Sequence, residues 1–177
     1  IDVFFIALHG TFGEDGELQE ILESKDLIYT GSYSKSSRLA FDKWESKKRF
    51  TAAGVTMPDS ILFKPGQKNT NLEKRISRLG SKYVIKPLRE GSTIGITIAD
   101  DPKQAVEVAK KCAAEFGECM IEGFIKGTEI TVGILGKQAL PILEIRSPAG
   151  FYDYHAKYIG DKTEYVFDSI NNPALVD

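Results

Sequence analysis

The fold is decided by the stretch Tyr83-Val-Ile-Lys-Pro-Leu-Arg-Glu-Gly-Ser-Thr-Ile-Gly-Ile-Thr-Ile98. Its first five residues are typical of a strand, and that strand delivers Lys86 into a loop. The segment 94–98 predicts the strand that returns. Between the two strands, residues 91–93 offer backbone N–H groups and hydroxyls that can surround phosphate oxygens, and the lysine supplies positive charge for the same anion. The stretch therefore predicts a phosphate-binding loop on a sheet.

The same loop also fits a simpler interpretation, a polar β-hairpin turn that holds no ligand. Gly-Ser sequences commonly mark turns, so the loop alone does not decide between the two. Its spacing matches neither the G-x-x-x-x-G-K-[ST] phosphate loop nor the G-x-G-x-x-G dinucleotide motif, which excludes both. The chain also has no G-x-S-x-G elbow, so a serine hydrolase has no support.

The beginning of the chain predicts an α/β layer. Residues 2–8 are short and almost continuously apolar, which is typical of a strand buried on both faces. A glycine-rich turn, His9-Gly-Thr-Phe-Gly-Glu-Asp-Gly16, leads into a helix whose apolar face includes Leu22, and residues 28–32 predict a short extended segment. This order places a binding site at the carboxyl end of the first strand.

Two later helices carry clear start signals, a capping residue followed three positions on by Glu or Gln. Asp42 caps the first, which ends near Ala53, and Asp101 caps the second, which ends at Gly117. A shorter helix is expected up to Arg78. Further strands are expected at residues 119–121, 129–135 and 140–145.

Two carboxylates, Glu122 and Glu129, bracket an apolar Phe-Ile pair. They can serve a purine nucleoside, with Glu122 at the base edge and Glu129 at the ribose hydroxyls. The alternative is a solvated acidic pair, because charged residues are mostly exposed. Glu129 shares its strand face with Thr131 and Gly133, small residues that leave room for a ligand.

The segment 150–158 concentrates three tyrosines, a histidine and a lysine in a loop. Loops of this kind commonly carry function, although a loop packed by its own aromatic rings is the alternative. His9 and His155 lie far apart, and neither has a partner at zinc-ligand spacing, so no transition-metal site is expected.

Composition excludes several classes of protein. The chain of 177 residues has 23 basic and 25 acidic residues, without the basic excess of a nucleic-acid-binding domain. Its longest apolar run, 3–8, is far short of the roughly 20 residues that span a bilayer, and its amino end lacks the features of a secretory signal. Cys112 and Cys119 are expected to be buried thiols in a reduced, cytoplasmic protein. The chain starts inside an apolar segment and ends at Asp177 without a closing element, which predicts an internal fragment.

Taken together, the motifs resemble the D-alanine–D-alanine ligases of the ATP-grasp superfamily. They come in that family's order, at near-family spacing, over almost the whole chain: residues 9–16, 29–32, 42–43, 86–95, 122 with 126–129, and 151–158. The resemblance implies an α/β protein with α+β lobes and the ATP-grasp fold. Residues 1–31 would end a Rossmann-like N-terminal substrate-binding lobe, 32–121 would form the central ATP-grasp lobe, and 122–177 would begin the C-terminal lobe.

The family joins two D-alanine molecules for peptidoglycan precursors. ATP phosphorylates the carboxylate of the first D-alanine, and the amine of the second attacks the acylphosphate. The resemblance implies ATP and Mg²⁺ as cofactors, with the Mg²⁺ ligands beyond Asp177, and a cytoplasmic homodimer. On this reading the fragment alone is inactive. No nucleic acid or membrane partner is implied.

The resemblance also implies roles for single residues. Those proposed for nucleotide are Lys43 and Lys86 at the phosphates, Ser92 and Thr93 in the lid over them, Glu122, Ile125 and Glu129 at adenine and ribose, and Lys157 at the transferred phosphoryl group. His9 would lie at the substrate carboxyl group. Ser92 and Tyr158 would belong to a hydrogen-bonded trio that holds the loop shut against water, and Tyr158 favours an amine acceptor over D-lactate.

Two positions depart from the family pattern. Thr93-Ile94 stands where Ser-Val is usual, and His155 stands where glutamate is more common. Two alternatives remain open: another ATP-grasp carboxylate–amine ligase, and a non-catalytic ATP-binding module. An α/β domain without any ligand would require every motif to be coincidental turn chemistry.

Overall fold

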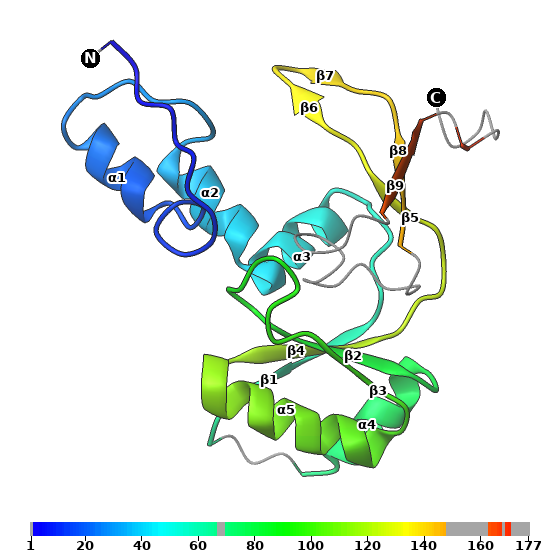
Figure 1. Cartoon of the computed structure of the whole chain (residues 1–177). Coiled ribbons are helices and arrows are strands. Elements are labelled where there is room, and N and C mark those ends of the chain that lie inside the picture. The colour runs from blue at the N-terminus through cyan, green and yellow to red at the C-terminus, as the bar shows by residue number, and fades with distance from the viewer. Residues whose placement is uncertain (1, 67–69, 148–162, 168, 171–177) are drawn as a thin grey trace. The chain divides into compact units, whose positions relative to one another are not determined.

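The computed structural model describes residues 2–66, 70–147, 163–167 and 169–170. The chain divides into two compact units, Ile1–Ile125 and Lys126–Asp177 (Figure 1). Both contain sheet, and the helices belong to the first, so the mixed helix-and-sheet class expected from the sequence is confirmed. In the described part of the chain, no helix is long and apolar enough to cross a bilayer. The three lobes expected from the resemblance remain a prediction.

A four-stranded antiparallel sheet is the frame of the first unit. Its strands, in spatial order, are β1 (Ser60–Phe63), β4 (Cys119–Gly123), β2 (Tyr83–Pro87) and β3 (Thr97–Ala99). The predictions of β2 and of a strand beginning at Cys119 are confirmed. The returning strand starts at Thr97 rather than at Ile94, because Ser92, Thr93 and Gly95 adopt positive φ angles that no strand accommodates.

The hydrophobic core lies between this sheet and the helices on one of its faces. These are α5 (Pro102–Phe116) and α4 (Leu72–Ile76), which a short 3₁₀ turn, Ser77–Leu79, extends (Figure 1). The side chains of Ile76, Ile85 and Ile121 are fully buried there, and each contributes about 1.5–3 kcal/mol of transfer free energy. Cys112 and Cys119 are free, buried thiols, as predicted.

Both predicted helix caps are confirmed. The Asp101 carboxylate accepts a hydrogen bond from the Gln104 N–H at 2.8 Å, and Gly117 follows the last residue of α5. Asp42 caps α3 (Lys43–Ala52), where its Oδ1 accepts the N–H groups of Trp44 and Glu45, each at 3.0 Å. These contacts satisfy N–H groups that the helix itself leaves free.

One helix was not expected from the sequence, α2 (Ser34–Phe41). It follows α1 (Glu17–Glu23), whose last residue binds its start. The Glu23 carboxylate accepts hydrogen bonds from the Ser34 N–H at 2.8 Å, from the Ser34 hydroxyl at 2.6 Å and from the Tyr29 hydroxyl at 2.6 Å. Because the capping carboxylate comes from another helix, the sequence around residue 34 contains no start signal, and α2 was therefore not predicted.

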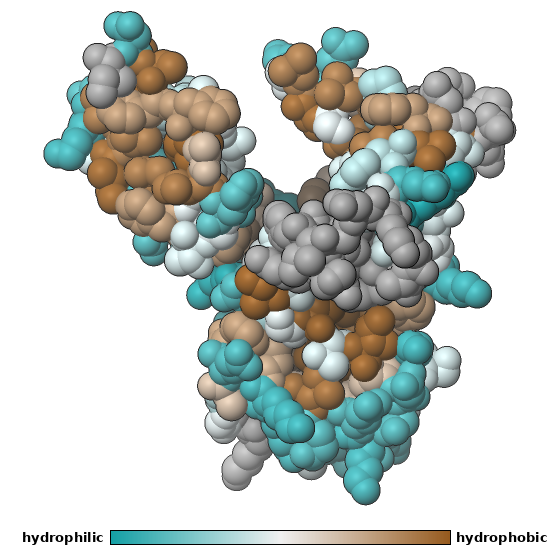
Figure 2. Space-filling model, in the orientation of Figure 1, coloured by the Kyte–Doolittle hydropathy of each residue, from teal (hydrophilic) through white to brown (hydrophobic). Residues whose placement is uncertain are grey.

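The prediction of a doubly buried strand at residues 2–8 is wrong. Among the described residues, this segment pairs only through a parallel bridge between Phe4 and Tyr29. Phe5 is 78% exposed and Val3 49% exposed, and Figure 2 shows the apolar surface of this region. A strand is buried on both faces only where neighbouring layers cover it, and the described residues provide one adjacent segment.

The second unit is built from short strands. β5 (Glu129–Thr131), β8 (Leu143–Arg146) and β9 (Glu164–Phe167) form an antiparallel sheet, and β6 (Ile134–Leu135) pairs with β7 (Gln138–Ala139) in a hairpin. The expected strand 129–135 is therefore two strands, and the one expected at 140–145 begins at Leu143. The chain leaves the first ladder at Gly133, whose carbonyl accepts the Leu140 N–H at 2.8 Å.

Candidate functional site

The centre of the candidate site is the carboxylate of Glu122, on the sheet face opposite the core. Glu122 lies on β4 opposite Val84 of β2, and Lys86 follows two residues along β2 on the same face. The Glu122 side chain is only 6% exposed, and its Oε2 forms an ion pair with Lys86 Nζ. A buried carboxylate of this kind needs charged partners.

The second partner of Glu122 is Lys47, which comes from α3. Its Nζ lies 2.6 Å from Glu122 Oε1 and also donates a hydrogen bond to the Pro58 carbonyl. The Lys47 side chain is 12% exposed, so it is nearly as buried as the carboxylate. Our sequence reasoning missed this residue. The available signal was its spacing of four from Lys43, which places both lysines on one helix face.

Lys43 brings a third positive charge to this region. Its N–H donates to the Leu88 carbonyl at 3.0 Å, and its ammonium group donates to the Glu90 carbonyl. Burial lowers the pKa of Lys43, and the nearby charge of Lys86 lowers it further. Lys47 and Lys86 therefore share the Glu122 carboxylate, and Lys43 adds its charge beside Lys86. Together the three ammonium groups suit a polyanion such as a triphosphate.

The loop after Lys86 has an unusual backbone. Ser92 and Thr93 have φ angles of 49° and 69°, in the left-handed region that residues other than glycine rarely adopt. Two turn hydrogen bonds hold it, from the Ile94 N–H to the Gly91 carbonyl at 3.0 Å and from the Ile96 N–H to the Thr93 carbonyl at 3.2 Å. Strained backbone of this kind clusters at ligand-binding sites.

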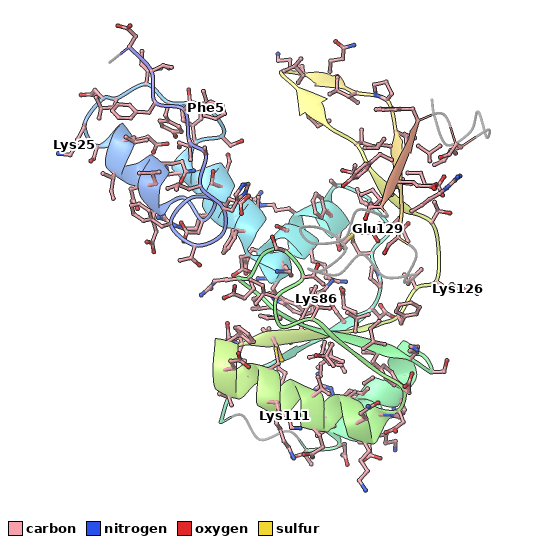
Figure 3. All side chains as sticks on the ribbon, in the orientation of Figure 1. Phe5, Lys25, Lys86, Lys111, Lys126 and Glu129 are labelled. Atoms are coloured by element: carbon pink, nitrogen blue, oxygen red, sulfur yellow. The ribbon has the colours of Figure 1, made fainter. Side chains whose placement is uncertain are left out.

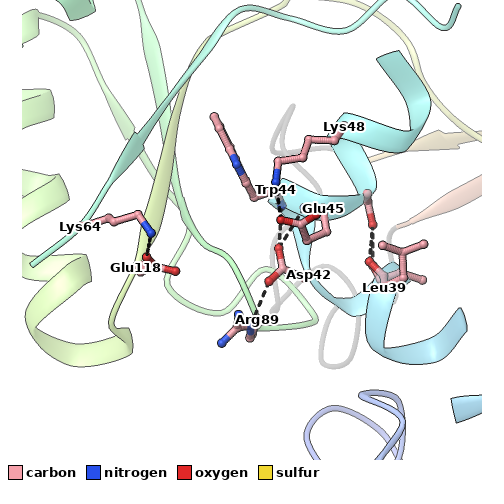
Figure 4. A network of polar contacts seen from close by, with 10 residues as sticks. Leu39, Asp42, Trp44, Glu45, Lys48, Lys64, Arg89 and Glu118 are labelled. Atoms are coloured by element: carbon pink, nitrogen blue, oxygen red, sulfur yellow. Dashed lines mark hydrogen bonds and ion pairs between the residues drawn. The ribbon is translucent and has the colours of Figure 1, made fainter. Parts of the chain in front are cut away.

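Asp42 ties this loop to the start of α3. Its Oδ1 caps the helix, while its Oδ2 accepts a hydrogen bond from Arg89 Nε at 2.9 Å (Figure 4). Asp42 is buried, whereas the Arg89 side chain is 70% exposed. The two contacts of Lys43 lie beside this pair, so the loop and the helix end are held together at three points.

The glycine-rich turn at residues 9–16 is held by its own acidic side chains. Glu14 accepts the Gly10 N–H at 2.6 Å, and Asp15 accepts the Phe12 N–H at 2.8 Å. His9 is exposed at the start of the turn. A cavity of about 730 Å³ lies between the turn and α2, and its lining includes Arg38 and Arg89. The turn and the lysine-bearing loop therefore border a common hollow.

Two further predicted residues, Ile125 and Glu129, are not among the residues that contact the Glu122 carboxylate in the described part of the chain. Ile125 is 69% exposed at the end of the first unit, and Glu129 is exposed on β5 of the second. Figure 3 labels Lys86 and Glu129 on their respective strands. Lys157, Tyr158 and His155 lie outside the described residues. Within the described ranges, no group of three or more His, Cys, Asp or Glu side chains could hold a metal ion.

Comparison with known proteins gives a consistent result. The family described as "D-ala D-ala ligase N-terminus" matches residues 1–32, and "D-ala D-ala ligase C-terminus" matches residues 50–175. The D-alanine–D-alanine ligase of Nitrosomonas eutropha is 43% identical over 169 residues, which are 95% of this chain and 54% of that protein. The chain thus spans about half the length of the curated relatives it matches.

Solved structures of similar proteins have the same fold over most of this chain. The D-alanine–D-alanine ligase from Bacillus anthracis complexed with ATP has a TM-score of 0.78 and 32% identity, over 98% of this chain and 54% of that chain. VanG, a D-Ala:D-Ser ligase from Enterococcus faecalis, has a TM-score of 0.77 and 33% identity, over 94% of this chain and 49% of its own.

Proposed function

The chain belongs to the D-alanine–D-alanine ligase family and has its ATP-grasp fold, and from this premise we propose that the protein joins two D-alanine molecules into D-alanyl-D-alanine. ATP is the phosphoryl donor. The carboxylate of the first D-alanine becomes an acylphosphate, and the amine of the second displaces phosphate from it. The observation that carries this proposal is the pair of lysines, Lys47 and Lys86, on the buried Glu122 carboxylate, with Lys43 close to Lys86.

The residues present fit the phosphate groups of ATP. Lys43 and Lys86 are close enough that, after burial, the charge of Lys86 lowers the pKa of Lys43, so a bound polyanion would offset the positive charge gathered there. Ser92 and Thr93 extend from the same loop and offer hydroxyls and N–H groups to the phosphates. When bound, ATP supplies the phosphoryl group that activates a carboxylate. The residues of this chain position and neutralise it.

The adenosine part of ATP is assigned to Glu122, Ile125 and Glu129. Glu122 is a buried acceptor at the sheet, and Ile125 follows shortly after it with an exposed apolar side chain suited to a base. Glu129 presents a carboxylate to the ribose hydroxyls. Glu129 belongs to the second unit, so this part of the proposal rests on the family resemblance.

The substrate side of the reaction is assigned to three further residues. His9, exposed at the glycine-rich turn, is proposed to lie at a D-alanine carboxyl group. Lys157 is proposed at the transferred phosphoryl group, and Tyr158, with Ser92, in the contact that closes the loop against water. Mg²⁺ accompanies ATP in this proposal, and no step is assigned to it here. A cytoplasmic homodimer also remains a prediction.

The main competing functions are ligations that use a different second substrate in place of the second D-alanine. The structural relative from Enterococcus faecalis is a D-Ala:D-Ser ligase of similar identity, so a different second substrate is a specific alternative. A carboxylate–amine ligase for other substrates, or a non-catalytic ATP-binding module, would share the same lysine cluster. These functions differ in which amino acid must be present for phosphate release.

The test is a phosphate-release assay on the full-length protein that carries this chain. Mg·ATP is supplied with D-alanine, with D-alanine plus D-serine or D-lactate, or with L-alanine. We expect release only with D-alanine and D-alanyl-D-alanine as the product. Lys86→Ala should lower activity about a hundredfold, since it removes charge stabilisation of the phosphoryl group, and Tyr158→Phe should do so less. Lys111→Ala, on the exposed side of α5, is the matched control. ATP binding without D-alanine dependence would contradict the proposal.

A further inference from the structure

The two lysines on Glu122 are held in different ways. Lys47 has two acceptors, Glu122 Oε1 and the Pro58 carbonyl, and its side chain is 12% exposed. Among the described residues, the Lys86 ammonium group contacts Glu122 Oε2 alone, and the Lys86 side chain is 24% exposed. Lys47 is therefore anchored at two points, whereas Lys86 is anchored at one and lies closer to solvent.

This asymmetry matters because Lys86 has a second task in the proposed function. An ammonium group that turns toward a phosphate oxygen gives up its ion pair with Glu122 Oε2. That oxygen then loses its partner inside a site that is only 6% exposed, and an unpaired buried charge is strongly unfavourable. Lys86 can leave only if another cation stays on the carboxylate and a new donor reaches Oε2.

From this geometry, and resting on the proposed ATP function, we propose that Lys47 is the positioning residue for purine recognition. It holds the Glu122 carboxylate in place through Oε1 while Lys86 moves to the phosphates, and Oε2 is then free to accept a hydrogen bond from the base. The same carboxylate thus exchanges a lysine for an amino group when nucleotide binds. Phosphate binding and base recognition are coupled through this exchange.

The exchange selects a particular kind of purine. Adenine carries an amino group at position 6, which donates to a carboxylate. Hypoxanthine carries an oxygen there, and two acceptors face each other without a hydrogen between them. A site with a buried hydrogen-bonding group rejects the analogue that leaves this group unpaired. The preference for ATP over inosine triphosphate therefore measures whether Oε2 is held in place.

The experiment compares three ligands by calorimetry on the full-length protein that carries this chain: ATP, inosine triphosphate and inorganic tripolyphosphate. The wild type should bind ATP at least about tenfold more tightly than inosine triphosphate. Lys47→Met should reduce this preference to about threefold or less while tripolyphosphate still binds. Lys47→Arg keeps the charge and should restore the preference. Lys48→Met is the matched control. Lys48 follows Lys47 directly on α3, but its side chain is 57% exposed and pairs with Glu45 instead of Glu122.

Each outcome decides between the two proposals. If the wild type binds neither ATP nor tripolyphosphate, the nucleotide function itself is wrong, and the inference falls with it. If ATP is preferred and Lys47→Met keeps the full preference, only the role of Lys47 is wrong. A wild type without any preference also overturns that role.

A measurement on the wild type covers the case in which Lys47→Met does not fold. The side-chain ¹⁵Nζ signals of Lys47 and Lys86 are followed by NMR while ATP is added. We expect the Lys86 signal to move and the Lys47 signal to stay near its starting position. Movement of Lys47 with a stationary Lys86 would overturn the exchange.

Discussion

Two acidic residues are expected at a nucleotide, and they lie in two different sheets that surround them in opposite ways. Glu122 lies in the four-stranded sheet of the first unit, where the core covers one face and Lys47 and Lys86 hold the carboxylate on the other. Glu129 lies in the three-stranded sheet of the second unit, in which none of the described residues is buried. The difference shows that a buried sheet fixes a charged side chain in advance of any ligand, whereas an exposed strand leaves it solvated.

The largest expected effect comes from removing the buried carboxylate. Glu122→Ala leaves two lysines without their shared partner and should lower the free energy of unfolding by about 4 kcal/mol, as is typical when one member of a buried ion pair is lost. Glu129→Ala, the matched change in the exposed sheet, should cost about 0.5 kcal/mol or less. Denaturant unfolding of both variants measures the two losses in the free energy of unfolding. Similar losses would show that the buried and the exposed carboxylate contribute equally to stability.

An apolar pair of substitutions tests the same contrast without charges. Ile121 is fully buried in β4, and Ile121→Ala should cost about 3 kcal/mol through lost burial and a residual cavity. Ile130 in β5 is 45% exposed, so Ile130→Ala should cost about 1 kcal/mol or less. The midpoints of urea unfolding provide the comparison. Equal losses would mean that β5 is as tightly packed as β4.

Features encoded within a few residues could be predicted from the sequence. The caps at Asp42 and Asp101 and the bounds of β2 follow from local hydrogen bonding and from short-range apolar pattern, and all of them are confirmed. Lys43 and Lys86 were expected at the phosphates, and the structure brings their charges close together. That placement is compatible with the expected role, which remains a proposal.

Features that depend on distant neighbours could not be predicted in the same way. The exposure of Phe5 depends on whether other layers cover its strand, and the start of α2 depends on Glu23 from a different helix. Lys47 was overlooked because a lysine in the run Lys47-Lys48 ordinarily faces solvent. Only the folded arrangement, which brings Glu122 from 75 residues away, gives it a buried partner.

The smallest expected effect is a pH dependence in the exposed sheet. Hydrogen bonds from the Arg146 guanidinium lower the pKa of Glu144 from its usual 4.5. A carboxyl group with a lowered pKa in the folded state stabilises it above pH 4.5, and this contribution is lost as the pH falls through the lowered value. An NMR titration of the Glu144 carboxyl carbon should show a midpoint below 4.5.

Arg146→Met provides the control for this titration. The variant removes the two hydrogen bonds from the guanidinium, each 2.9 Å long, so the Glu144 midpoint should move up toward 4.5. A midpoint unchanged by Arg146→Met would show that the pair does not persist in solution. The exposed sheet would then hold its acidic residues even more loosely than the comparison with Glu122 implies.

The double engagement of Asp42 limits how this position can change during evolution. One oxygen caps α3 and the other binds Arg89, so a substitution of Asp42 affects both contacts at once. Serine or asparagine would preserve the cap, but neither offers a negative charge to the guanidinium. A lineage that drifts away from aspartate therefore loses the contact that holds Arg89 at the start of α3, and the two positions are expected to vary together.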